Sequence, residues 1–384
     1  MTTPTTHYRA CNLCEAMCGI EVQLSGREVV SIRGDENDAF SRGYICPKAL
    51  ALKDIYEDPD RLTQPVRRVG DQWEKISWDE ALDETAQRLH AIQSEHGRNA
   101  VGVYLGNPNS HNFGTLVFGP PFLRTLGSPN RFSATSCDQL PLMMASYFMF
   151  GHQLLFPVPD IDRTDYMLML GANPLASNGS IMAAPGIRKR IKALQARGGK
   201  LVVVDPRRSE TAGVADEHVF IRPGADAYFL LALLHELLRD GPDLGRLTSH
   251  VVNVEHVEAA VRDFPPERVA DLTGVPANTV RRIANDIRNA PTAVAYGRMG
   301  TSTQEFGSLC MWLINVINGV TGNLDEPGGA MFSSPAVDVL NAAGGFGAGR
   351  GSFGRWRSRV RELPEFGGEL PSATMAEEIM TEGD

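Results

Sequence analysis

Cysteine is scarce in this chain, at six residues in 384, and long apolar runs are missing. So few cysteines exclude a small scaffold held together by disulfides. No run reaches the roughly 18 apolar residues that a membrane-spanning helix needs. The first ten residues contain neither an apolar segment nor a twin arginine. Acidic residues outnumber basic ones, and the net charge of −9 argues against nucleic acid as a partner. We therefore predict a cytoplasmic globular protein without a membrane span.

Four of the six cysteines form one pattern near the start. Cys11, Cys14 and Cys18 follow C-x2-C-x3-C, and Cys46 follows after a gap of 27 residues. Four thiolates can hold a [4Fe–4S] cluster, one on each iron. Structural zinc is the alternative, but zinc sites with four cysteines usually use two short pairs rather than three plus one. The pattern therefore predicts a [4Fe–4S] cluster and electron transfer.

The rest of the chain alternates apolar strands with segments of helical periodicity. A hairpin is expected over residues 20–32, and Ser77 with Glu80 forms a capping box that starts a helix to about residue 96. Further strands are expected at residues 100–106, 166–170, 200–204, 219–221 and 292–296, with helices at 187–197, 226–239, 265–290 and through 312–317. This alternation is typical of a mostly parallel sheet. Three polar loops, residues 171–174, 205–208 and 222–226, should meet at the carboxyl ends of its strands, where such sheets bind ligands. Residues 342–354 are rich in glycine, and the acidic segment 362–384 is expected as loop.

Several motifs in a fixed order carry a resemblance to a known family. They are the cysteine set ending in Cys-Pro-Lys, the Gly-Ala-Asn-Pro turn at 171–174, the run 199–207 ending in Asp-Pro-Arg, the Arg-Pro-Gly-x-Asp loop at 222–226, and the glycine-rich segment 322–329. In this order they resemble the N-terminal portion of the molybdopterin oxidoreductase catalytic subunits, the group of dimethyl sulfoxide reductase, periplasmic nitrate reductase and formate dehydrogenase. The resemblance extends over essentially the whole chain.

The resemblance implies an α/β fold with a C-terminal part missing. It implies a small [4Fe–4S] domain with a β-hairpin at residues 1–60, an incomplete α/β domain from 61–133 plus 310–384, and a Rossmann-like, guanine-dinucleotide-binding α/β domain at 134–309. Members of the family usually continue well beyond this length. We therefore expect a truncated product or one half of a split enzyme, which by itself does not retain both pterins.

The resemblance also implies two molybdopterin guanine dinucleotides that together hold molybdenum or tungsten. Candidates for binding a guanine dinucleotide are Gly171, Asn173, Asp205, Arg207, Arg222, Gly224, Asp226 and Gly300. Arginine can clamp phosphates, aspartate can accept hydrogen bonds from ribose or guanine, and glycine lets the backbone approach a ligand. The alternative is ordinary turn chemistry, since loops are rich in these residues.

The family's side-chain ligand to the metal falls, by order, in residues 133–141. Cys137 and Asp138 are both candidates, and Ser136 is a third. For Cys137 the alternative is a buried, inert thiol. Lys48, two residues after Cys46, would lie between cluster and pterin, whereas the alternative is a solvated surface lysine. His111 and His152 receive no role, and Cys310 is expected in the core.

The resemblance implies an oxidoreductase that transfers an oxygen atom or a hydride at the metal and passes electrons through the [4Fe–4S] cluster. Expected partners are a small-molecule substrate and either a redox protein or the C-terminal half of the enzyme. Formate is slightly favoured over nitrate and small S- or N-oxides. The alternative is a non-catalytic [4Fe–4S] electron-transfer subunit or an inactive fragment.

Overall fold

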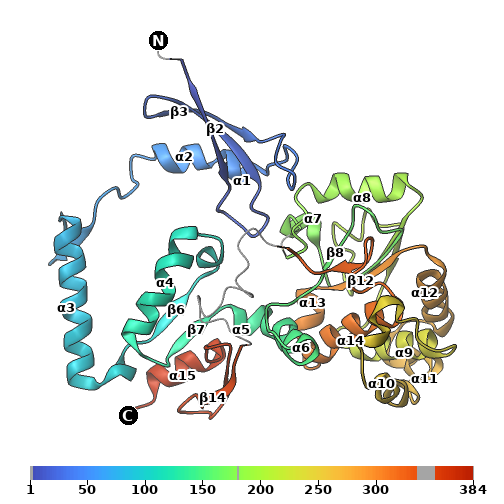
Figure 1. Cartoon of the computed structure of the whole chain (residues 1–384). Helices are drawn as coiled ribbons and strands as arrows, with labels where there is room; N and C mark the ends of the chain where they lie inside the picture. Colours follow the sequence, from blue (N-terminus) through green and yellow to red (C-terminus); the bar gives the residue numbers. More distant parts are fainter. Residues whose placement is uncertain (1–2, 180, 335–350, 384) are drawn as a thin grey trace. The chain divides into compact units, whose positions relative to one another are not determined.

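The computed structural model describes residues 3–179, 181–334 and 351–383 (Figure 1). The chain forms two compact units. Unit 1 combines residues 1–134 with 352–384, and unit 2 is the continuous segment 135–351. In the part of the chain that is described, no helix is long and apolar enough to cross a membrane.

Unit 1 begins with a three-stranded antiparallel sheet of β1 (Thr5–Ala10), β2 (Gly19–Ser25) and β3 (Glu28–Gly34), in that order. The predicted hairpin is therefore confirmed as β2–β3, and Gly26 in its turn has a φ of +63°. Two short helices follow, α1 (Pro47–Leu50) and α2 (Leu52–Glu57). The small core of this part is Cys11, Ala16, Cys18, Ile20 and Ala49.

The hairpin β4 (Val66–Val69) and β5 (Gln72–Lys75) precedes α3 (Trp78–His96), whose predicted capping box is confirmed. Next come the turn η1 (Arg98–Ala100), β6 (Val103–Leu105), the turn η2 (Asn107–Ser110), α4 (Phe113–Leu126) and β7 (Arg131–Ser133), which pairs parallel to β6. The sequence predicted a buried strand over 100–106. The strand is shorter, and Tyr104 is half exposed. The reason is that β6 pairs only with β7, and a two-stranded sheet cannot bury both faces of the strand.

The acidic segment 362–384, expected as loop, contributes regular structure to unit 1. It contains β15 (Pro364–Phe366), which pairs with β14 (Phe353–Arg357), then the turn η4 (Ser372–Thr374) and α15 (Met375–Met380). The hydroxyl of Ser133 donates to the carboxylate of Glu369 over 2.5 Å. Acidic side chains here are thus not all solvated, and Glu365 is fully buried.

A parallel four-stranded sheet forms the centre of unit 2. Its order is β11 (Glu217–Val219), β10 (Lys200–Val204), β9 (Tyr166–Leu170) and β12 (Ala293–Gly297), with every neighbouring pair parallel. All residues of β9 and β12 are buried. Strands buried on both faces read as continuous apolar runs, so the predicted parallel sheet is confirmed.

Helices cover both faces of this sheet, as Figure 1 shows. Met167 and Met169 face α8 (Ile187–Ala196). Leu168 and Leu170 face the opposite layer, which contains α9 (Asp226–Leu238), α10 (Val254–Val261), α11 (Pro266–Thr273), α12 (Ala277–Asn289) and α14 (Gly307–Val320). The sequence assigned residues from 310 onward to the segment with 61–133. The structure instead packs α14 on the sheet of unit 2, because this helix is apolar on nearly all sides.

Shorter elements complete unit 2. They are α5 (Thr135–Asp138), α6 (Leu140–Phe150), α7 (Pro174–Ser177), the turn η3 (Gly245–Ser249) and α13 (Met299–Ser302), with the two-stranded pair β8 (Val158–Pro159) and β13 (Ala330–Met331). Most of the glycine-rich segment at 342–354 lies outside the described residues.

Candidate cofactor-binding site

The cysteine motif of unit 1 is a closed loop between β1 and β2. The amide of Cys11 donates to the carbonyl of Cys18 over 2.8 Å, which joins the two ends of the loop. Cys46 is the N-cap residue of α1, and its carbonyl accepts a hydrogen bond from the Ala49 amide. Cys11, Cys14, Cys18 and Cys46 are all free thiols. The motif is therefore available as a set of ligands.

The four thiols of the motif influence one another electrostatically. Burial, together with the nearby Cys14, Cys11 and Cys46, raises the pKa of the Cys18 thiol to about 11. Burial also raises the pKa of Cys11, while a hydrogen bond from the Leu13 amide lowers it. Four thiolates crowded without positive charge repel one another, and bound iron removes that repulsion. The donor set thus fits an iron–sulfur cluster. Among the described residues, no group of His, Cys, Asp and Glu is arranged to hold a single metal ion.

At the carboxyl end of the sheet in unit 2, the loops after β9 and β12 touch through two glycines. The amide of Gly300 donates to the carbonyl of Gly171 over 2.9 Å. A Cβ atom on Gly171 would lie 2.7 Å from the Gly300 Cα atom and 2.6 Å from the Thr301 amide nitrogen. Gly171 also has a φ of +53°, so both backbone conformation and space require glycine there.

Asn173 joins the loop after β9 to the loop after β10. Its amide nitrogen donates to Glu210 over 2.6 Å, and its oxygen accepts from the Thr211 hydroxyl over 2.8 Å. In the same loop, the Asp205 carboxylate accepts from the Arg207 amide over 2.7 Å. Asn173 is thus a brace between two loops, and the Asp205 and Arg207 side chains remain at the edge of the sheet.

The loop after β11 brings a buried carboxylate to the same edge. Asp226 is the first residue of α9, is only 5% exposed, and accepts from the Gln304 amide nitrogen over 2.9 Å. Burial raises the pKa of Asp226, and Asp205 raises it further. Within the described residues, the Oε1 atom of Gln304 is buried without a hydrogen-bond partner. Two acceptor groups therefore meet at the start of α9. Gly224, two residues before Asp226, has open space at its Cβ position.

Arg222 of this loop is turned to the protein itself. One of its guanidinium nitrogens donates to the Asp271 carbonyl over 2.5 Å, and its amide donates to the Thr273 carbonyl over 2.8 Å. These two bonds to α11 fix the position of Arg222 at the edge.

The segment with the candidate metal ligands is tied to the loop after β12. The Ser302 hydroxyl donates to the Asp138 carbonyl over 3.1 Å. Arg298 donates to the Gln139 side-chain oxygen over 2.9 Å. Cys137 is exposed and Asp138 half-buried. The structure therefore brings Cys137 and Asp138 to the edge that carries Gly171 and Gly300, and it favours neither as a ligand.

Other candidates have plainer surroundings. Lys48 is exposed on α1. Cys310 is fully buried in α14, as expected, and burial raises its pKa to about 12. His152 is buried in unit 2 and accepts from the Leu154 amide over 3.0 Å. Gln304, Arg298 and Ser302 were not predicted as site residues, because only tertiary contacts place their loop beside Asp226 and Asp138.

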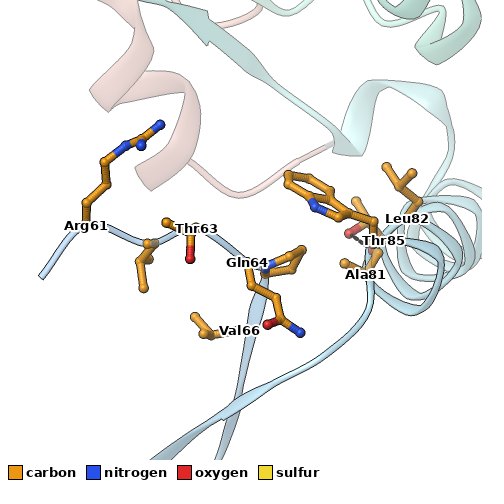
Figure 2. Close-up of a pocket in the computed structure, with 10 residues that line it drawn as sticks. Arg61, Thr63, Gln64, Val66, Ala81, Leu82 and Thr85 are labelled. Atoms are coloured by element: carbon orange, nitrogen blue, oxygen red, sulfur yellow. Dashed lines mark hydrogen bonds between the residues drawn. The ribbon is translucent and has the colours of Figure 1, made fainter. Parts of the chain in front are cut away.

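A hollow of about 690 Å³ lies in unit 1 and is lined by none of these residues (Figure 2). Its walls come from the connection 61–66 and from the first turns of α3, including Gln64, Ala81, Leu82 and Thr85. Leu82 is 63% exposed. The lining has no cluster of titratable groups, so the hollow does not have the chemistry of a cofactor site.

Comparison with family models decides the relationship. Residues 61–360 match the model of the molybdopterin oxidoreductases, and residues 4–57 match the model of their Fe4S4 domain. This chain belongs to the molybdopterin oxidoreductase family. The four cysteines thus lie in the Fe4S4 domain of that family. This match favours an iron–sulfur cluster over the zinc alternative.

Known relatives are similar over about half of their own length. The molybdopterin-containing subunit of thiosulfate reductase from Salmonella typhimurium is 30% identical over 87% of this chain and 43% of the relative. Periplasmic nitrate reductase from Desulfovibrio desulfuricans is 26% identical over 87% of this chain and 45% of the relative. The solved structure of acetylene hydratase from Pelobacter acetylenicus shares the fold, with a TM-score of 0.70, 24% identity, and coverage of 82% of this chain and 43% of that one.

Proposed function

We propose that this chain binds a [4Fe–4S] cluster through Cys11, Cys14, Cys18 and Cys46, and a molybdopterin guanine dinucleotide at the strand-end edge of unit 2. It would serve as part of a molybdenum or tungsten bis(molybdopterin guanine dinucleotide) oxidoreductase. When bound, the metal centre supplies two-electron chemistry, and the cluster relays single electrons to a partner. Family membership supports this proposal, as does the set of free thiols in the closed loop.

The observation that carries the nucleotide proposal is the pair of Asp226 and Gln304. Both offer oxygen acceptors, and the Gln304 oxygen lacks a donor within the described residues. Guanine presents adjacent N1–H and N2–H donors, whereas adenine presents an acceptor at N1. The oxygen acceptors of Asp226 and Gln304 therefore suit guanine better than adenine. Gly224 leaves room for the backbone to approach the ligand.

Phosphates would be bound by arginines of the neighbouring loops. Arg207 is exposed, 3.6 Å from Glu210, and Arg222 is held in place by α11. One guanidinium group can bind a phosphate through two parallel hydrogen bonds. Asn173 would keep the loops after β9 and β10 at a fixed separation, and the Gly171–Gly300 contact would form the floor beneath the ligand.

Cys137 or Asp138 would provide the side-chain ligand to the metal, and Lys48 would lie between cluster and pterin. The bonds from Ser302 and Arg298 hold the ligand segment at the nucleotide edge. For the substrate we propose formate, nitrate or a small S- or N-oxide. The chain spans less than half the length of the first relatives, and we propose that a second polypeptide segment completes the second pterin site.

The decisive experiment is cofactor analysis of the anaerobically purified chain. Iron, molybdenum, tungsten, pterin fluorescence and released guanine nucleotide are measured for the natural chain and for Cys46→Ser and Asp226→Asn. We expect about four irons per chain, lost in Cys46→Ser, and guanine nucleotide lost in Asp226→Asn with the iron retained. Iron without pterin in the natural chain would contradict the nucleotide proposal and favour an electron-transfer subunit. Two guanine nucleotides per chain would contradict the need for a second segment.

A further inference from the structure

His111 is connected to the cysteine motif although it lies 99 positions from its partner in the chain. It follows the turn η2 in unit 1, and is only 8% exposed. Its Nδ1 atom lies 2.8 Å from the carbonyl oxygen of Asn12. Asn12 is the residue directly after Cys11. A histidine that the sequence analysis left without a role therefore contacts the loop of the cluster.

The chemistry of the two partners fixes the direction of this hydrogen bond. A carbonyl oxygen only accepts, so Nδ1 of His111 must carry the proton. On the other side of the ring, the Asn107 amide nitrogen lies 3.4 Å from Nε2 and can donate to it. Both contacts are satisfied by the same neutral form, with its proton on Nδ1. The turn that carries Asn107 is itself held by the Asn109 side chain, which donates to the Gly106 carbonyl over 2.9 Å.

The peptide that accepts from His111 also faces a cluster ligand. The carbonyl of Asn12 and the amide of Leu13 belong to one planar peptide unit. The Leu13 amide is hydrogen-bonded to the Cys11 thiol. One peptide group thus accepts from His111 on one side and donates to a ligand sulfur on the other. A hydrogen bond to the carbonyl fixes the plane of the peptide and polarises it, which strengthens the amide as a donor.

We propose that His111 is a positioning residue that tunes the reduction potential of the cluster through the Asn12–Leu13 peptide. The inference rests on the proposed cluster at the four cysteines. Hydrogen bonds to the sulfurs of an iron–sulfur cluster help set its potential. They stabilise the reduced cluster, which carries the larger negative charge, more than the oxidised one. His111 therefore holds the potential above the value that the loop alone would give.

Redox titration of the full chain, followed by electron paramagnetic resonance, tests this proposal. His111→Leu removes the donor, and His111→Asn keeps an N–H in a similar place. The matched control is His152→Ala, since His152 is a buried histidine of unit 2. We expect His111→Leu to lower the ratio of reduced to oxidised cluster about threefold to tenfold at a fixed potential, a tenfold change being a midpoint shift of about 59 mV for one electron. His111→Asn should restore most of the shift, and His152→Ala should cause none.

If His111→Leu kept an intact cluster with the same midpoint potential as the natural chain, the proposal would be overturned. Equal shifts in His111→Leu and His111→Asn would do the same, because they would trace the effect to packing rather than to the donor. If His111→Leu does not retain iron, Asn107→Leu provides a milder change that unlocks the ring while leaving it in place, and its midpoint must also fall. Absence of a [4Fe–4S] signal from the natural chain would instead refute the proposed cluster.

Discussion

The contact between Gly171 and Gly300 allows conformational strain and steric overlap to be measured separately. Gly171→Ala introduces both, because the residue has a φ of +53° and its Cβ would lie 2.6 Å from the Thr301 amide nitrogen. An L-residue in the left-handed region costs about 1–2 kcal/mol. Forcing an extra methyl into a packed contact costs about 1–3 kcal/mol more. We therefore expect Gly171→Ala to lower the free energy of unfolding of unit 2 by about 2–5 kcal/mol.

Two matched variants isolate each contribution. Gly198→Ala carries only the conformational cost, since Gly198 has a φ of +84° and open space around its Cβ position. Gly300→Ala carries only the overlap, since its Cβ would lie 2.7 Å from the Gly171 Cα atom without a left-handed backbone. The effect of Gly171→Ala should therefore approach the sum of the effects of Gly198→Ala and Gly300→Ala.

Thermal unfolding by calorimetry and far-ultraviolet circular dichroism measures these differences. For a unit of this size, each kcal/mol lowers the Tm by about 2–4 °C, so Gly171→Ala should unfold about 4–20 °C earlier. Gly300→Ala should unfold about 2–12 °C earlier. A Gly300→Ala variant as stable as the natural chain would show that the two loops do not touch, and would remove the floor of the proposed nucleotide site.

Three further substitutions test other parts of the molecule. Burial raises the pKa of Asp226, so its charged form destabilises the folded ligand-free chain once the pH exceeds the ordinary carboxyl pKa. Asp226→Asn should therefore raise the Tm at neutral pH but not below about pH 4, and equal shifts at both pH values would contradict this. Arg298→Leu, which removes the donor to Gln139, should reduce bound molybdenum or tungsten while guanine nucleotide stays, as elemental analysis would show. Ser77→Ala should destabilise the start of α3 by about 1 kcal/mol, seen as faster hydrogen exchange there, and unchanged exchange would refute the cap.

Local patterns in the sequence were sufficient for the elements that depend on local rules. The continuous apolar runs at 166–170 and 200–204 predicted buried parallel strands, and Ser77 with Glu80 predicted a helix start, because burial on both faces and capping leave marks at fixed spacing. The apolar run at 100–106 misled, since its burial depends on what packs around it. Acidic residues after 362 read as loop, although the buried Glu365 is bonded within the fold.

The parts of the site that the sequence could not predict are those that depend on tertiary contacts. Nothing near Gln304 in the chain indicates Asp226, since the two residues meet only because α9 and α14 pack together on one face of the sheet. His111 reaches Asn12 in the same way, through a turn that follows a distant strand. Asn173 was singled out for a ligand, and the structure shows that its side chain is already engaged by Glu210 and Thr211. The residue types in the loops therefore predicted the location of the candidate site better than the role of each side chain in it.

The split of unit 1 into two segments around unit 2 imposes an order on folding. Unit 2 is continuous, so its sheet and helices can form as soon as residues 135–351 have left the ribosome. Unit 1 can close only afterwards, when Glu369 becomes available to Ser133 across 236 positions of the chain. Contacts between residues far apart in the chain form slowly, because closing the long intervening loop costs conformational entropy. During synthesis the cysteine loop is thus made long before the last segment of the unit around it.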